Sequence, residues 1–258
     1  MRINLIVFII GLGLSGTVLN AQGPPIRLDK PIMLGSGEST VRALYNYINT
    51  DQTNYSMALL MADHNVTSDF AVEVEIPWVF SSDWGSDRPG DMSVMLKYQF
   101  YRKDGMGKTT RIAAKAKHSF PTGRELKVPI AGMGHHKTYF GTLAAYESLS
   151  LGVQAEVGYY VVPGESDLNM LSYQLGVALP LLPPAYPTNQ INVYLEADGM
   201  NMRGHEGHSQ YGYYIAPGLQ YARGKFTVEA SVRFPISQDL PIGYEQNWNL
   251  LAGGRMVL

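Results

Sequence analysis

The 258-residue chain contains no cysteine. This absence excludes a disulfide framework, thiolate metal ligands, a cysteine nucleophile and a lipid-modified amino-terminal cysteine. Charge is scarce as well, because Asp, Glu, Lys and Arg make up 16% of the chain, whereas soluble domains carry about 25%. The formal net charge is only −2, which gives no reason to expect a nucleic acid as a partner. No cofactor is expected either.

Long apolar runs are missing after the first residues of the chain. The chain opens with Arg2, an apolar run over residues 3–14 and then small or polar residues up to Ala21. This pattern is typical of a secretory signal peptide, predicted here over residues 1–21. No later stretch approaches the ~18 apolar residues that a membrane helix needs. We therefore expect an exported protein in which no helix spans a membrane.

What the chain does contain is alternation with a period of two residues. In residues 90–101, GDMSVMLKYQFY, one face of an extended strand is polar with Met95 out of pattern, and the other face carries Met92, Val94, Leu96, Tyr98 and Phe100. Five apolar residues at period two cannot form one face of a helix. The pattern recurs through most of the chain and often ends in aromatic residues, which predicts a membrane-spanning β-barrel. A soluble β-sandwich, which also uses alternating strands, is the alternative.

Twelve strands are predicted, an even number as in single-chain bacterial barrels. The predicted fold class is all-β, a single closed antiparallel up-and-down transmembrane β-barrel over residues 39–258. The strands are expected at about 40–49, 55–62, 69–79, 90–101, 109–118, 137–147, 151–161, 171–179, 191–197, 211–221, 226–234 and 248–258.

The segments outside the strands predict which way the barrel faces. Residues 22–38 hold three prolines and no period, so we expect a flexible periplasmic lead-in. From a periplasmic start, short polar turns fall on the periplasmic side and most of the longer loops on the outer side. The last strand ends at Leu258 with apolar residues alternating behind it, which resembles the terminal signal of outer-membrane barrels. The barrel assembly machinery and outer-membrane lipids are therefore expected partners.

Charged residues on the polar faces of the strands are the candidate functional residues. Carboxylates at alternate positions of a lipid-exposed strand are tolerated only where they point into a wet lumen. These side chains would either create a transverse field that selects solutes by charge, or pair with each other and fill a narrow lumen. The candidates are Glu73, Glu75, Lys97, Arg111, Lys115, Lys117, Glu156, Glu196, Asp198, Glu229, Arg233 and Arg255.

Metal and enzyme chemistry find little support in the sequence. His205 and His208, three residues apart in a Gly-rich loop, are weak metal candidates and do not match the HExxH motif, so no metal site is predicted. An outer-membrane lipid hydrolase would need a Ser and a His on one face of a strand. His208 and Ser209 are adjacent, so on a strand they would face opposite sides. We predict no catalytic residues and no enzyme.

Three segments resemble a known family, namely GDMSVMLKYQF, AAKAKHSFPTGRE and YYIAPGLQYARGKFTVEASVRFPI. They resemble the outer-membrane β-barrel proteins of the MetA-pathway of phenol degradation family, also described simply as transporters. The resemblance covers roughly residues 69–258. It implies a porin-like barrel that passes small, often hydrophobic or aromatic molecules, and it does not single out phenol. The alternative function is a structural or surface-binding barrel whose lumen is closed by internal charge pairs.

Overall fold

The structure, a computed structural model, describes residues 25–51, 54–82, 88–123, 134–184, 189–203, 209–240 and 245–258. Nearly all of the regular structure in this part of the chain is β-strand, with one short 3-10 turn, η1 (Ser166–Leu168). The strands are β1 (Ser39–Asn49), β2 (Asn54–Asn65), β3 (Phe70–Ser82), β4 (Arg88–Pro89), β5 (Ser93–Gly105), β6 (Lys108–Ser119), β7 (Lys137–Ser148), β8 (Gly152–Val161), β9 (Met170–Pro180), β10 (Asn189–Arg203), β11 (Ser209–Arg223), β12 (Phe226–Asp239) and β13 (Trp248–Val257).

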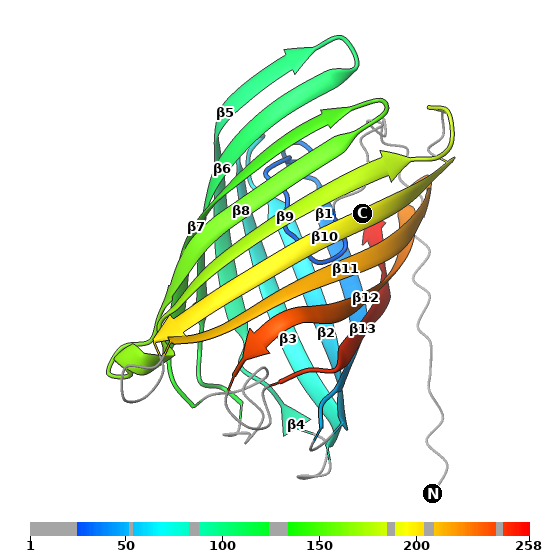
Figure 1. Cartoon of the computed structure of the whole chain (residues 1–258). Helices are drawn as coiled ribbons and strands as arrows, with labels where there is room; N and C mark the ends of the chain where they lie inside the picture. Colours follow the sequence, from blue (N-terminus) through cyan, green and yellow to red (C-terminus); the bar gives the residue numbers. More distant parts are fainter. Residues whose placement is uncertain are drawn as a thin grey trace, which may run out of the picture.

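The strands form one antiparallel sheet that closes on itself. Each long strand pairs with the next one along the chain, and β3 pairs directly with both β2 and β5. The first and last strands meet as well, from the pair Thr40 and Val257 to the pair Asn49 and Trp248. The two-residue β4 pairs only with β3. The result is a tilted barrel of 12 strands with one small extra strand (Figure 1), as the alternation predicted.

The two faces of the wall differ as the sequence predicted. Outward side chains are apolar and exposed, for example Leu96, Val157 and Val228 at 44%, 53% and 58%. Inward neighbours such as Lys97 and Glu156 are buried. The polar residues therefore form the interior and the apolar residues form the outer surface, which is the arrangement of a barrel surrounded by lipid and not of a soluble sandwich.

Short turns gather at one end of the barrel, which we call the turn end. Residues 106–107, 149–151 and 224–225 make these turns, at the end where β1 begins and β13 finishes. Gly107 and Gly224 have positive φ angles, which residues with a side chain rarely adopt. At this end β5 extends beyond β3, so that residues 101–105 pair with β6 alone (Figure 1). The opposite end carries the longer connection between β6 and β7 and is called the loop end.

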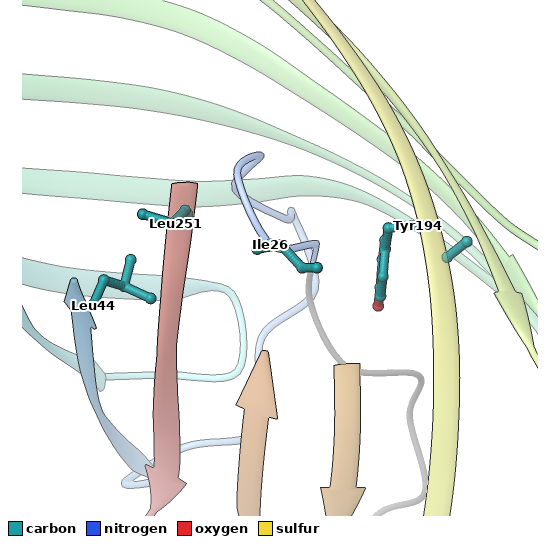
Figure 2. Packing of buried hydrophobic residues seen from close by; sticks show 5 residues of the cluster. Ile26, Leu44, Tyr194 and Leu251 are labelled. Carbon is teal, nitrogen blue, oxygen red and sulfur yellow. The ribbon is translucent and has the colours of Figure 1, made fainter. Parts of the chain in front are cut away.

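Residues 25–36, here called the N-terminal segment, lie inside the barrel. Next to this segment, the Gly37 N–H donates to the carbonyl of Asn65 at 2.7 Å, at the turn end of β2. Further in, Ile26 packs among buried side chains from opposite walls, which include Leu44, Tyr194 and Leu251 (Figure 2). The sequence predicts a flexible lead-in at residues 22–38. The structure instead places the described part, from residue 25, in the lumen, where the barrel supplies its contacts.

Candidate functional site

The candidate site is the barrel lumen. One part of its wall carries a row of lysines on β5 and β6. Lys97 and Lys115 are directly opposite each other in the register of these strands. Like charges in such a position destabilise a sheet unless anions lie nearby. Each lysine forms an ion pair with a carboxylate. Lys115 Nζ lies 2.6 Å from Glu156 on β8, and Lys97 Nζ lies 2.7 Å from Asp29 of the N-terminal segment. Lys117 pairs with Glu75 on β3.

Asp29 joins the N-terminal segment to this basic wall. Its carboxylate accepts a hydrogen bond from Lys97 and lies 3.7 Å from Lys115. Burial disfavours the charged form of Asp29, but the two ammonium groups outweigh burial and lower the pKa of Asp29 to about 2. Asp29 is therefore an anion at neutral pH and attracts the segment to β5 and β6.

Arg27 joins the segment to the opposite wall, at β12 and β13. Its guanidinium donates to Asn249 Oδ1 at 2.7 Å and to Ser231 Oγ at 3.0 Å. It also donates to the backbone carbonyls of both residues, at 3.1 Å each. These four hydrogen bonds use neutral acceptors, so the wall fixes the planar guanidinium by geometry more than by opposite charge.

Glu196 on β10 binds the backbone of the segment. Its carboxylate accepts hydrogen bonds from the backbone N–H of Arg27 at 3.0 Å and of Leu28 at 3.1 Å. A carboxylate with such donors is a strong acceptor. Glu196, a lumen candidate from the sequence, therefore binds the chain's own main chain.

A second ionic cluster lies where β1, β12 and β13 adjoin. Glu229 accepts from Arg42 at 2.6 Å and from Gln220 Nε2 at 2.9 Å, and Arg255 lies 3.8 Å away. Arg42 also donates to the carbonyl of Ile26 at 2.5 Å. The cluster therefore couples the closing seam of the barrel to the N-terminal segment.

Two further candidate residues form a pair with each other. Arg233 donates to Asp198 at 2.5 Å, and its guanidinium carbon lies 3.6 Å from the centre of the Tyr214 ring. A guanidinium stacked on an aromatic face is held in place by a cation–π interaction. This pair makes a rigid polar patch on β10, β11 and β12.

Arg111 stands apart from the lumen network. It lies at the turn end and bonds Asp104 at 2.7 Å and Thr109 at 2.7 Å, both near the projecting tip of β5 and β6. The alternation predicts Arg111 on the polar face of its strand. The hairpin, however, carries it to the rim, where it contacts neither the segment nor the lysine row.

A cavity of about 360 Å³ remains beside the N-terminal segment. Drug-sized pockets fall at about 300–1,000 Å³, so the space is large enough for a small molecule. Its lining combines charged side chains with apolar ones, among them Glu73, Lys97, Met95, Ile32 and Met61.

The residues that the sequence missed are mainly those of the segment. Arg27 and Asp29 were assigned to a lead-in, and Arg42 lies on a strand with imperfect alternation. One signal was available: Ile26, Arg27, Leu28 and Asp29 alternate apolar and charged residues between two prolines. The weak metal candidates His205 and His208 lie outside the described residues. Within the described ranges no group of three or more His, Cys, Asp or Glu side chains could hold a metal, and no helix is long and apolar enough to cross a membrane.

Comparisons with known proteins identify the fold and not the family. No protein-family model matches the chain, and no curated protein matches its sequence. The COG4313 outer membrane channel from Pseudomonas putida F1 is similar in structure, with a TM-score of 0.68 and 13% identity, covering 91% of this chain and 100% of that one. The NanC porin is similar with a TM-score of 0.54 and 12% identity, covering 85% and 99%.

The closed sheet, the apolar outer wall and the polar lumen define the class of this molecule. It is a transmembrane β-barrel of the outer-membrane type, and its place is the bacterial outer membrane. Its fold is shared with a protein described as an outer membrane channel and with one described as a porin.

Proposed function

We propose that this protein is a passive, non-enzymatic outer-membrane channel for small molecules, and that the N-terminal segment narrows its lumen. The observation that carries the proposal is the charged cavity of about 360 Å³ that remains inside the closed barrel beside this segment. A barrel of about twelve strands is wider than eight-stranded barrels, whose side chains just fill the interior.

The composition of the cavity lining supports a class of solute. Ile32, Met61 and Met95 lie around the same space as Lys97 and Glu73. Such a lining suits a small molecule with an apolar or aromatic body and a polar group. This preference agrees with the resemblance to the MetA-pathway of phenol degradation family, which we retain as a hypothesis for this chain.

The second candidate function is a structural or surface-binding barrel that conducts nothing. The charge pairing favours it, because ion pairs such as Lys115 with Glu156 and Arg42 with Glu229 use up inward charges and cross-link the walls. Transport across the membrane separates the two functions directly.

Single-channel recording in planar bilayers tests the proposal with the wild type and the variant Arg27→Ala/Asp29→Ala. The variant removes the two charged side chains that anchor the segment to opposite walls, so we expect its conductance to exceed that of the wild type. Arg102→Ala, which alters only the projecting hairpin, is the matched control and should leave conductance unchanged. Folded barrels of the wild type and of the double variant that both fail to conduct would exclude the channel and leave the closed barrel.

A further inference from the structure

Two histidines meet at the loop end of the barrel, on the outer side of the wall. His118 is the second-last residue of β6, and His136 directly precedes the first residue of β7. His118 Nε2 lies 3.1 Å from His136 Nδ1. The two rings are stacked, with centroids 5.3 Å apart and planes inclined by 25°. Neither histidine takes part in the lumen contacts described above.

A third residue fixes the orientation of His118. Its Nδ1 lies 2.8 Å from Thr138 Oγ1, its cross-strand neighbour on β7. When Nδ1–H donates to this hydroxyl, Nε2 carries a lone pair that points toward His136. A hydrogen bond from the second ring nitrogen is the arrangement that orients histidine ligands in metal sites.

The distance between the two nitrogens fits one metal ion. Bonds from zinc to imidazole nitrogen are about 2.0–2.1 Å long. Two such bonds span about 3.3 Å at a tetrahedral angle and about 3.1 Å at an angle near 100°. The 3.1 Å separation of His118 Nε2 and His136 Nδ1 therefore matches one bound ion, once the rings turn both lone pairs toward it and the proton of His136 moves to Nε2.

The surroundings hold the rings and leave room for water. Phe120 packs edge-on against His118, with ring centroids 4.6 Å apart and planes at 77°. Alternation along β6 places His118 outward, on the side opposite Lys117. His118 is partly exposed and His136 is exposed, so solvent can reach the face where the ion would sit. In the described part of the chain no further His, Asp or Glu completes a set of three.

We propose that His118 Nε2 and His136 Nδ1 bind a single divalent transition-metal ion, with water in the remaining positions. Imidazole ligands suit Zn²⁺, Cu²⁺ and Ni²⁺, and Cu²⁺ should bind most tightly of the three. The metal would link the end of β6 to the start of β7 across the connection between them. The site is independent of the channel, since it lies on the other face of the wall.

Calorimetric titration of the detergent-purified full-length barrel with Cu²⁺ and Zn²⁺, after treatment with a chelator, tests the site. His118→Ala and His136→Ala should each weaken binding by about tenfold or more, and Thr138→Val, which removes only the orienting hydroxyl, by about tenfold. His135→Ala is the matched control, because it removes the neighbouring imidazole and should leave the affinity unchanged. Heat-modifiable migration on a gel verifies that each variant is folded.

Electron paramagnetic resonance of the Cu²⁺ complex gives an independent readout. The wild type should show coupling to two imidazole nitrogens, and each single variant should show at most one. Equal affinity in the wild type and in His118→Ala/His136→Ala would overturn the proposal, and so would a loss of binding in His135→Ala as large as in His136→Ala. Conductance is expected to be the same with and without metal, so either result is separate from the test of the channel.

Discussion

Two ion pairs that involve the hairpin of β5 and β6 have the same length and different surroundings. Inside the barrel, Lys115 Nζ lies 2.6 Å from Glu156, and the two side chains are 10% and 6% exposed. At the projecting tip, Arg102 Nε lies 2.6 Å from Asp104, and the side chains are 54% and 43% exposed. Distance alone therefore does not distinguish the two pairs.

The two pairs differ in whether water can solvate the charge that remains when one partner is removed. At the tip, solvent can take over from either partner, and exposed ion pairs contribute about 0–1 kcal/mol. In the lumen wall, the loss of one partner leaves a charge that water reaches poorly, which costs about 3–5 kcal/mol. Asp29 joins the N-terminal segment to the wall by an ion pair of the second kind, whereas the pair at the projecting tip can be lost at little cost in stability.

The largest effect is expected at Glu156. Glu156→Ala leaves Lys115 with the more distant Asp29 as its carboxylate partner and also removes the acceptor of the Tyr139 hydroxyl, which lies 2.6 Å from Glu156. The free energy of unfolding should fall by about 3 kcal/mol or more. Urea titration of the barrel in phospholipid vesicles measures it. A loss below about 1 kcal/mol would mean that this part of the lumen is as wet as the tip.

An intermediate effect is expected on the lipid side of the same strand. Leu96, next to Lys97 in sequence, faces outward. Leu96→Arg places a charge against acyl chains and should destabilise the barrel by about 2–4 kcal/mol if this position is near the bilayer centre. Leu96→Ala is the control for lost apolar area. Equal stability of the Arg and Ala variants in vesicles would contradict the assignment of this face to lipid.

The smallest effect is expected at the tip. Arg102→Ala removes one partner of Asp104, which still has Arg111 at 2.7 Å and Thr109 at 2.7 Å. The unfolding free energy should change by less than about 1 kcal/mol, and added salt should reduce the change further. The same urea titration at low and high salt measures both. A loss as large as that of Glu156→Ala would remove the distinction between the two pairs.

Most of the fold could be predicted from sequence because a membrane imposes a local rule. Each strand must alternate between lipid and lumen, so faces such as that of Leu96 and that of Lys97 follow from a few neighbouring residues. The strand ends were less predictable. β10 continues to Arg203 and β12 to Asp239, where loops were expected. Beyond the lipid belt both faces can be polar, so the alternation fades while the backbone ladder continues.

The lumen was predictable only in part. The inward position of each candidate charge follows from its own strand, but its partner depends on which strands adjoin and on their stagger. Lys97 is therefore identified by alternation, whereas its contact with Asp29 is not. The N-terminal segment alternates over only four residues, 26–29, and its prolines prevent a strand ladder. Its place inside the barrel arises from long-range contacts such as those of Arg27 with Ser231 and Asn249.

The fully exposed turn at Met106 offers a practical handle on the orientation of the barrel. Met106 is fully exposed, and the chain contains no cysteine. A Met106→Cys substitution would thus create a unique attachment point for a maleimide dye. Intact cells that stay unlabelled by an impermeant dye, and become labelled after the envelope is opened, would place the short turns on the periplasmic side.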